Sequence, residues 1–314
     1  MSLKVTAAGL MSLLMDAGRF GKASLGLTQG GPVDPFAFEL ANHLVGNESN
    51  TTAIEVTLGG LSLQAQTDCV VSVTGAGLPV KLNGRDSPMW RAFVVRAGES
   101  LELGQPESAL RSYVAVQGGF AVTPQFGSTS TVMREGIGGL NGNKLQTGDL
   151  LPLGKPQRLH SLALAEPDIP AYSANPVLRL IPGYQFKQFS AVNRALFFAS
   201  EYEITGQADR MGYRLKGQGV AADIQGMLSE GISLGAVQVP ADGQPIVLLN
   251  DRQTIGGYPK LGNVLSLDCT SLAQCRPGTK VSFEAISMEQ AHNLLHLHRA
   301  FKQRLLEQLE PVDA

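Results

Sequence analysis

The sequence predicts a mainly β fold, either a sandwich or a barrel, with few helices. Glycine (36 residues) and proline (17 residues) are frequent in this chain of 314 residues, and between them lie short segments of valine, leucine, isoleucine and threonine. Many short strands separated by turn residues are typical of sandwiches and barrels. The clearest candidate strands are 52–58, 69–74, 92–95, 113–116 and 246–249.

Two short stretches have the apolar periodicity of a helix. The first is DPFAFELANHLVGN, in which Asp34 is a natural N-cap, Pro35 suits the first helical position and Gly46 supplies a stop. The second spans 190–200 and places apolar residues along one side. We therefore expect two short helices within a chain that is otherwise strand-rich.

A longer helix is predicted near the C-terminus. It begins at Ser287, where Gln290 completes a capping-box pattern. An apolar stripe along one face predicts that it packs against the barrel or a partner chain. The stripe consists of Met288, Ala291, Leu294, Leu295, Phe301, Leu305 and Leu309.

The chain reads as two related halves, 1–160 and 177–314, joined by a connection at 161–176. The surrounding segment is rich in proline and lacks clean alternation. Each half has a strand, Asn-x-Arg, a spacer, and Arg-x-Gly before the next strand: GLPVKLNGR and RAGESLEL in the first, GQPIVLLNDR and RPGTKVSF in the second. The spacer is longer in the second half. This pattern favours a duplication, although such short similarities also arise between unrelated β proteins.

Composition excludes several classes of protein. With 43% hydrophobic and 17% charged residues, the chain can bury a substantial core. A formal net charge of -2 gives no global attraction for nucleic acid. The N-terminus lacks the pattern of a signal peptide and no apolar run could span a bilayer, so we expect no membrane association and a cytoplasmic location. Three cysteines are too few for a disulfide framework.

The segment NDRQTIGGYP, at 250–259, concentrates polar chemistry directly after the apolar run IVLL. Its side chains could simply satisfy the backbone groups of a turn. A binding site is favoured because Gly256 and Gly257 allow close approach, Tyr258 combines an aromatic ring with a hydroxyl, and Arg252 suits a carboxylate or phosphate. Asp251 would orient that arginine or hold a metal.

Two further segments are candidates. ADRMGYRLKG places Asp209, Arg210, Tyr213 and Arg214 around a glycine, although an exposed turn would explain it equally well. In MREGIGGLNG, Arg134 precedes Gly136, Gly138 and Gly139, whose amides could hold an oxyanion. The chain has neither a P-loop nor the strand–GxGxxG–helix context of a dinucleotide site.

Metal and nucleophile motifs are not evident. His292 and His296 lie one helical turn apart, yet Asn293 stands where a zinc protease carries glutamate. No Gly-x-Ser-x-Gly elbow is present, so a covalent acyl-enzyme has no support. We predict no protein-bound metal site.

Several segments together resemble one family across nearly the whole chain. They are GGPVDPFAFELANHLVGN, AIEVTLGG, ADRMGYRL, GAVQVPADGQPIVLLNDRQTIGGYPKLGNV and LAQCRPGTKVSF. The family includes allophanate hydrolase subunit 2, KipA-type proteins, the C subunit of 5-oxoprolinase and other biotin-dependent carboxyltransferase-like proteins. The resemblance implies a cyclophilin-like β-barrel architecture, in two related barrel halves. It also implies a complex with a KipI-type protein (the B subunit of 5-oxoprolinase) and a third subunit.

The activity that the resemblance implies is ATP-dependent opening of the 5-oxoproline lactam to L-glutamate. A site for that chemistry needs cations for phosphates, Mg²⁺ and donors for the substrate carboxylate. From residue chemistry we assign catalytic roles to Asp251, Arg252 and Arg210. Substrate or nucleotide binding is assigned to Arg134, Tyr213, Gln253, Thr254, Gly256, Gly257 and Tyr258.

Two alternatives stay open at this point. A carboxyltransferase acting with carboxybiotin would need biotin on the lysine of another protein, because this chain has no Met-Lys pair in a carrier-like context. A non-catalytic, KipA-type regulator of a kinase inhibitor would show no turnover.

Overall fold

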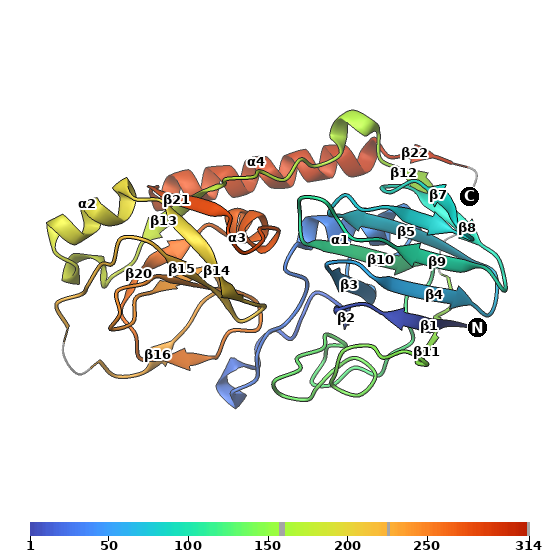
Figure 1. The fold of residues 1–314 in the computed structure, drawn as a ribbon, viewed down its shortest axis with the longest axis horizontal. Helices are drawn as coiled ribbons and strands as arrows, with labels where there is room; N and C mark the ends of the chain where they lie inside the picture. Colours follow the sequence, from blue (N-terminus) through green and yellow to red (C-terminus); the bar gives the residue numbers. More distant parts are fainter. Residues whose placement is uncertain (157–160, 225–226, 313–314) are drawn as a thin grey trace. The chain divides into compact units, whose positions relative to one another are not determined.

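The computed structural model describes residues 1–156, 161–224 and 227–312, and it is mainly β, as predicted. The chain divides into two compact units (Figure 1). Unit 1 comprises residues 1–20, 30–171 and 302–314, and unit 2 comprises residues 21–29 and 172–301.

Two antiparallel sheets form unit 1. The first has the order β11 (Leu150–Pro152), β1 (Ser2–Ala8), β4 (Leu61–Ala65), β9 (Ser100–Leu103), β6 (Val80–Leu82), β7 (Arg85–Ser87). The second has the order β2 (Met11–Met15), β3 (Ala53–Thr57), β10 (Arg111–Val116), β5 (Cys69–Gly75), β8 (Ala92–Val95).

The core of unit 1 lies where these sheets pack together. Alternate residues of β4 are buried, among them Leu61 and Leu63, and they join Val73 of β5 and Val114 of β10 in one apolar cluster. Burying each such side chain contributes about 1.5–3 kcal/mol to the free energy of unfolding. Alternation along the strands therefore determines which face of each sheet enters the core.

Helix α1 (Pro35–Leu44) covers the opposite face of the second sheet. As predicted, Asp34 caps it: the carboxylate accepts a hydrogen bond from the amide of Ala37 at 3.1 Å, and Pro35 opens the first turn. The chain leaves the helix through Gly46, whose φ is +75°. Phe38 packs edge-on against Tyr113 of β10, with ring centroids 6.0 Å apart.

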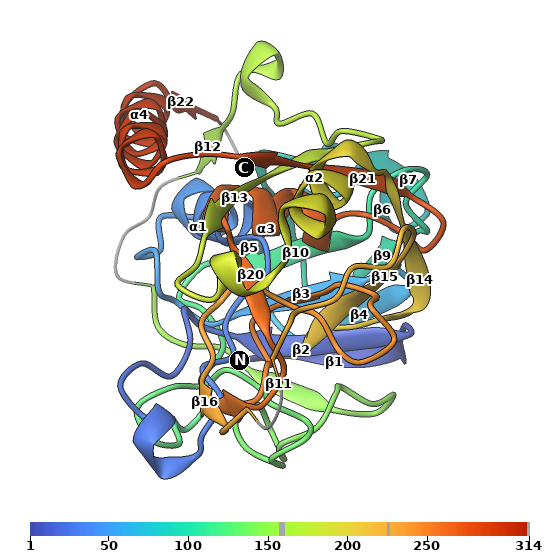
Figure 2. The ribbon, with the colours of Figure 1, turned by 90° about the vertical axis from the view of Figure 1, so that its left-hand side faces the viewer.

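Unit 2 is a closed barrel, which confirms the predicted barrel architecture for this part of the chain. The ring runs β13 (Val177–Pro182), β20 (Lys260–Val264), β17 (Ala236–Gln238), β18 (Ile246–Leu248), β15 (Gly212–Lys216), β14 (Tyr202–Ala208), β21 (Lys280–Ala285). Figure 2 shows the molecule with the left-hand side of Figure 1, where the barrel strands are labelled, toward the viewer. Neighbours are antiparallel except β13 and β21, whose parallel pairing closes the ring.

Two short helices and a ribbon accompany the barrel. Helix α2 (Ala191–Ala199) confirms the second predicted helix; Ser190 caps it, and Phe197 packs against Tyr202 and Phe283 of the barrel. Helix α3 (Ser266–Ala273) was not predicted, and it lies in the longer spacer of the second half. Strands β16 (Glu230–Gly231) and β19 (Ile255–Gly256) pair as a separate ribbon.

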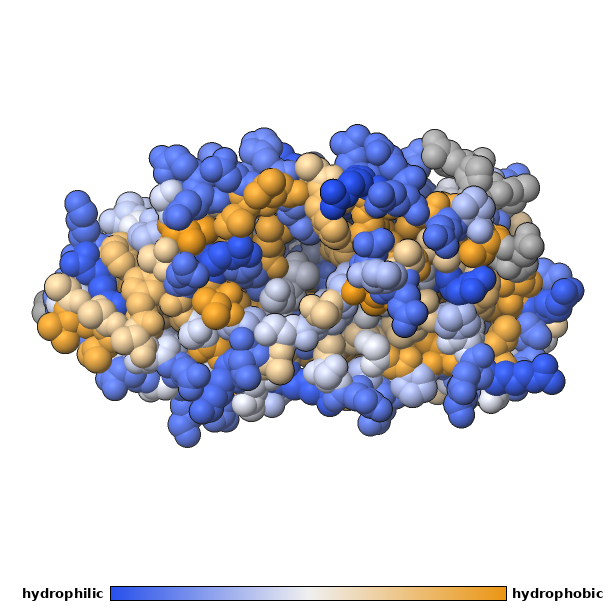
Figure 3. Space-filling view, turned by 90° about the horizontal axis from the view of Figure 1, so that it is seen from above, coloured by the Kyte–Doolittle hydropathy of each residue, from blue (hydrophilic) through white to orange (hydrophobic). Residues whose placement is uncertain are grey.

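Helix α4 (Met288–Glu307) begins at the predicted capping box. The amide of Ser287 donates to the Gln290 side chain at 2.8 Å, and the amide of Gln290 donates back to the Ser287 hydroxyl at 3.2 Å. Ala291, Leu294 and Leu295 pack in unit 2, whereas Leu305, Leu306 and Leu309 pack in the cluster of unit 1 that includes residues of α1. The predicted stripe thus serves two separate cores, and its Met288 is exposed. Figure 3, which views the molecule from above relative to Figure 1, shows hydrophilic and hydrophobic residues interspersed on the surface that faces the viewer.

Each of the two units is built from segments that are separated in the sequence, so the chain is not divided at one connection. Residues 21–29 join unit 2. Residues 302–314 join unit 1, because Leu305 and Val312 pack in its core. Within the predicted connection, β12 (Leu162–Ala163) pairs with β22 (Glu310–Pro311). The predicted boundary at residue 160 lies outside the described residues.

The remaining turns of 3-10 helix are η1 (Ala23–Leu25), η2 (Glu166–Asp168) and η3 (Phe186–Gln188). All three cysteines are free thiols. In the part of the chain that the structure describes, none of the helices combines the length and the apolar character needed to cross a membrane.

Candidate functional site in the second unit

The predicted loop at 250–259 starts where β18 ends, next to the turn between β14 and β15. The ladder of hydrogen bonds between β15 and β18 continues beyond both strands: the amide of Leu249 donates to Met211 at 2.9 Å, and that of Asp251 to Arg210 at 2.8 Å. Backbone pairing therefore places two segments that the sequence singled out side by side.

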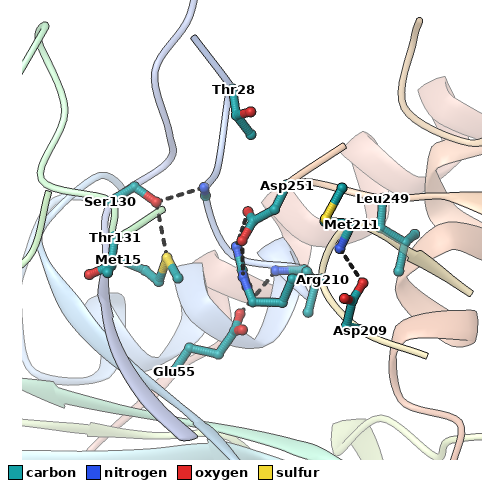
Figure 4. Close-up of polar contacts among 12 residues, drawn as sticks. Met15, Thr28, Glu55, Ser130, Thr131, Asp209, Arg210, Met211, Leu249 and Asp251 are labelled. Atoms are coloured by element: carbon teal, nitrogen blue, oxygen red, sulfur yellow. Dashed lines mark hydrogen bonds and ion pairs between the residues drawn. The ribbon is translucent and has the colours of Figure 1, made fainter. Parts of the chain in front are cut away.

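Asp251 and Arg210 form a buried ion pair with two parallel hydrogen bonds. The Arg210 Nε donates to Asp251 Oδ2 and the Nη2 to Oδ1, both at 2.9 Å (Figure 4). Only 5% of the arginine side chain and 11% of the aspartate side chain are exposed. Asp251 was expected to orient Arg252 or hold a metal. It binds Arg210 instead, because the hydrogen bond between the Asp251 amide and the Arg210 carbonyl places these two residues side by side.

The turn that carries Arg210 is held by its neighbour. Asp209 Oδ1 accepts a hydrogen bond from the amide of Met211 at 2.8 Å (Figure 4). It also accepts one from the amide of Gly212 at 3.2 Å. A Cβ at Gly212 would lie only 2.9 Å from both Val247 O and the Leu248 side chain. Glycine is therefore required for β15 to approach β18 this closely.

Arg252 lies beneath the loop and supports its backbone. Its Nε donates to the carbonyl of Ile232 at 3.2 Å and its Nη1 to that of Leu249 at 3.1 Å. Burial lowers the pKa of this guanidinium below its ordinary value. The carbonyl of Arg252 in turn accepts a hydrogen bond from the Thr28 hydroxyl, which belongs to the same unit, at 3.3 Å.

A cavity of about 470 Å³ opens beside this turn. Asp209 and Met211, the residues on either side of Arg210, contribute to its wall. Of the predicted residues, Gln253 and Tyr258 line it. Its volume is within the range of small-molecule sites, roughly 300–1,000 Å³.

The other residues of the predicted loop build the ribbon next to the cavity. The Thr254 carbonyl accepts a hydrogen bond from the amide of Ile232 at 3.0 Å. Gly256 pairs with Glu230 in the β16–β19 ribbon. A Cβ at Gly257 would meet the Ser229 hydroxyl at 3.4 Å.

Tyr213 does not face the cavity. Side chains alternate along β15, so Gly212 and Arg214 lie on the cavity side while Tyr213 points to the opposite face. Tyr213 is fully buried, and its hydroxyl donates to the carbonyl of Ala273 at 3.2 Å. The structure assigns it to barrel packing rather than to the predicted ligand contact.

Arg134 belongs to unit 1, where its Nη2 forms an ion pair with Glu135 at 3.0 Å. The amides expected to hold an oxyanion nearby are used internally: Gly136 donates to Met133, Gly138 to the Gln125 side chain, and Gly139 to Thr129. The predicted oxyanion role for these glycines is wrong, because the loop needs their donors for its own turns.

Sequence reasoning missed Gln238 as a cavity residue and gave no role to Asp209 and Arg214, which also line the cavity. Asp209 and Arg214 lay in a segment that was noted but were not selected. Gln238 gave a signal of its own, since it is the polar residue in the buried strand of GAVQVP. Over residues 1–156, 161–224 and 227–312, no group of three or more His, Cys, Asp or Glu side chains could hold a metal ion.

Comparisons with known proteins agree on one family. The model of the carboxyltransferase domain, subdomains A and B, matches residues 25–285. The chain is 38% identical over 310 residues to the C subunit of 5-oxoprolinase from Escherichia coli (strain K12), with 98% of this chain and 97% of that protein covered. It is 39% identical over 285 residues to the C subunit of 5-oxoprolinase from Haemophilus influenzae, with 90% of each covered.

A solved structure extends the similarity to a larger enzyme. The crystal structure of the K. lactis urea amidolyase superimposes with a TM-score of 0.91 at 25% identity. The match covers 97% of this chain and 20% of that one.

Proposed function

Because the chain belongs to the family of the carboxyltransferase domain, subdomains A and B, we propose that it is a subunit of an ATP-dependent 5-oxoprolinase. The observation that carries the proposal is the 38% identity to the C subunit of a 5-oxoprolinase over 98% of this chain and 97% of that protein. The similarity therefore extends over both units rather than over one of them. The complex would contain a KipI-type subunit and a third subunit, and would work in the cytoplasm.

The reaction proposed is opening of the 5-oxoproline lactam to L-glutamate. An unstrained amide resists water, so ATP transfers its γ-phosphoryl group to the amide oxygen and ADP is released. Water then adds to the ring carbon, the C–N bond breaks as the nitrogen takes up a proton, and a second water releases phosphate from the resulting acyl phosphate. In sum, 5-oxoproline, ATP and two waters give glutamate, ADP and phosphate.

The chain's own residues contribute binding and orientation in this scheme. Arg210, held rigidly by two hydrogen bonds to Asp251, fixes the turn whose neighbours Asp209 and Met211 line the cavity. Arg252 braces the loop that carries Gln253. A geometry held in this way contributes to catalysis by positioning, which does not require a nucleophile from the protein.

Magnesium fits the residues of unit 2 poorly. Both oxygens of Asp251 already accept from Arg210, and the described residues offer no cluster of three metal-binding side chains. Mg²⁺ prefers one or two carboxylates together with phosphate oxygens. We therefore assign Mg²⁺ and ATP to the assembled complex and derive no step from a metal held by this chain.

A carboxyltransferase acting with carboxybiotin is the second candidate. It is favoured by the membership of the chain in the carboxyltransferase-domain family and by the TM-score of 0.91 to a urea amidolyase. Biotin would have to arrive on the lysine of another protein. This candidate predicts that the chain transfers a carboxyl group to urea in the presence of a carboxylated carrier. It also predicts that the chain takes no part in the turnover of 5-oxoproline.

The decisive experiment mixes the purified chain with the KipI-type and third subunits and measures glutamate released from 5-oxoproline, with and without ATP. We expect release only when all three subunits and ATP are present. No release from the complete set would refute the proposed function.

A further inference from the structure

Three neighbouring strands of unit 2 present one polar row to the cavity. Arg214 of β15 and Gln238 of β17 are both in register with Ile246 of β18. Residues directly opposite each other share one face of a sheet, and neighbouring strands lie about 4.8 Å apart. The Arg214 and Gln238 backbones are therefore separated by roughly 10 Å, and all three side chains line the cavity.

The next row of the same face is apolar and small. Leu248 of β18 is in register with Gly212 of β15, two residues from the first row on each strand. Leu248 also packs with Ile232, Ala236 and Ile246 in a cluster of its own. Together the two rows form an apolar floor, with a cation at one edge and a carboxamide at the other.

Gln238 is the unusual member of this face. It is only 1% exposed, and its Nε2 is buried without a hydrogen-bond partner among the described residues. Leaving a buried donor unsatisfied costs roughly 1–3 kcal/mol. An apolar residue of similar shape would avoid this cost, so the amide is explained more naturally by a ligand than by folding.

The backbone of Gly256 packs closely against the amide, where a side chain would not fit. A Cβ at Gly256 would lie 2.9 Å from Gln238 Nε2 and 2.5 Å from Ile232 Cδ1. Half a turn about the last torsion of glutamine exchanges its nitrogen and oxygen, and this torsion is soft. Rotation about this torsion therefore exchanges the positions of the donor and the acceptor of the amide.

A five-membered lactam matches this arrangement. The ring holds its amide cis, so that the N–H and the C=O lie on the same edge, whereas most amides hold them on opposite sides. A side-chain carboxamide offers one donor and one acceptor in one plane, and can pair with such an edge through two hydrogen bonds. The ring methylenes of the lactam would lie over Ile246 and Leu248.

We propose that Gln238 recognises the lactam edge of the substrate while Arg214 binds its carboxylate. This inference rests on the proposed function and names the substrate site within it. The carbonyl oxygen keeps its second lone pair while it accepts from Gln238, so it is still able to attack a phosphoryl group. Gln238 and Arg214 are thus specificity determinants beside the Arg210–Asp251 pair.

The test compares two glutamines in the assembled complex. Gln238→Met removes the amide with little change of shape, and we expect KM for 5-oxoproline to rise about 10- to 100-fold, the worth of one or two hydrogen bonds. The unfolding midpoint of the chain should stay unchanged or rise, because a buried unpaired donor is removed. A merely structural role for Gln238 would lower that midpoint instead.

Gln244→Met is the matched control. The Gln244 side chain is half-buried and already paired, accepting from the amide of Gly217 at 2.8 Å and donating to its carbonyl at 3.3 Å. We expect this substitution to lower the unfolding midpoint slightly and to leave KM for 5-oxoproline unchanged.

A second probe separates the two contacts. 2-Pyrrolidone has the lactam but no carboxylate, and we expect it to compete with 5-oxoproline. Arg214→Met should raise KM for 5-oxoproline about tenfold or more, the worth of a charge-assisted hydrogen bond, while leaving the inhibition constant of 2-pyrrolidone unchanged. Gln238→Met should weaken both compounds.

Binding measured by ligand-observed NMR distinguishes failure of this inference from failure of the proposed function. If the complete complex releases glutamate and Gln238→Met leaves KM within twofold, the inference is overturned and the function stands. If the complex binds 5-oxoproline, loses that binding in Gln238→Met, and yet releases no glutamate, the function fails and the inference stands. Absence of binding to the wild-type complex overturns both.

Discussion

Each unit of the molecule buries an aspartate just beyond a buried strand, yet the two carboxylates have different partners. Asp16 follows β2 in unit 1 and is 6% exposed; Asp251 follows β18 in unit 2 and is 8% exposed. Asp16 accepts hydrogen bonds from neutral donors, namely the amides of Gly18, Thr129 and Ser130 and the hydroxyl of Ser128. Asp251 accepts from a guanidinium.

The difference separates a structural carboxylate from a candidate functional one. The donors to Asp16 fasten the loop at 128–130 to the end of β2, and Arg19 reinforces that loop by donating to the carbonyls of Ser128 and Ser130. The donor to Asp251 is a side chain in a turn whose neighbours line a cavity. Burial alone does not distinguish the two roles, whereas the identity of the donor and the adjacent space do.

Breaking the pair at Asp251 should have the largest effect. Asp251→Asn removes the carboxylate charge that pairs with the buried Arg210 guanidinium, so we expect the free energy of unfolding to fall by about 3–5 kcal/mol. Glutamate release by the complex should fall by roughly 100-fold or more, the scale for losing one preorganised electrostatic contact. Urea unfolding and a glutamate assay measure the two effects.

A double substitution sharpens this result. Arg210→Met combined with Asp251→Leu replaces the pair with apolar side chains, and should recover most of the stability. Recovery of turnover as well would show that the pair is structural, like Asp16.

Asp16→Asn is the corresponding test in unit 1. The substituted amide turns an N–H₂ group toward donors, so we expect a loss of about 2–4 kcal/mol in the free energy of unfolding. Turnover per folded molecule should stay near that of the wild type. A loss of turnover larger than the loss of folded protein would contradict the distinction between the two aspartates.

Arg252→Ala tests whether the arginine braces the loop or serves the reaction. Two hydrogen bonds to backbone carbonyls are lost, so we expect the free energy of unfolding to fall by about 1–3 kcal/mol. If the loop's geometry is needed for the reaction, glutamate release should disappear even at temperatures where the variant is folded. Arg252→Lys, which keeps the charge but has a single donor nitrogen, should retain the fold and part of the turnover.

Ionisation of the cysteine thiols should have the smallest effect on the free energy of unfolding. Cys69 lies in unit 1 and Cys269 in unit 2, so the two thiols allow the units to be compared. Burial raises the pKa of Cys269 in unit 2 to about 12, and burial together with the charge of Asp68 raises that of Cys69 in unit 1 to about 11, both from 9.0. Since the folded state holds these protons more tightly, their contribution to stability is complete below pH 9 and is lost as the pH rises toward 12.

Unfolding measured between pH 8 and pH 11 should therefore show the free energy falling only above pH 9. Alkylation at pH 8 should modify the half-buried Cys69 before the buried Cys269. Modification of Cys269 first would indicate that unit 2 opens more readily than unit 1.

Much of the fold could be predicted because its signals are local. Asp34 and Ser287 cap their helices through side chains only three residues away, and strand alternation is visible over a few residues. Helix α3 was missed because its apolar periodicity is weak and it has no side-chain cap. The candidate site was predicted only in part. The loop at 250–259 and Arg210 were both selected, but the ion pair between Arg210 and Asp251 was not predicted.

By itself, the sequence determined the mainly β class, the helix ends and the polar loop after IVLL, since each depends on neighbouring residues. Only the tertiary structure decided that Asp251 pairs with Arg210 instead of Arg252. Likewise, only the register of β15, β18 and β17 placed Arg214, Ile246 and Gln238 in one row. Strand register joins residues far apart in the chain, and shifting it by one residue would move every one of these side chains to the opposite face.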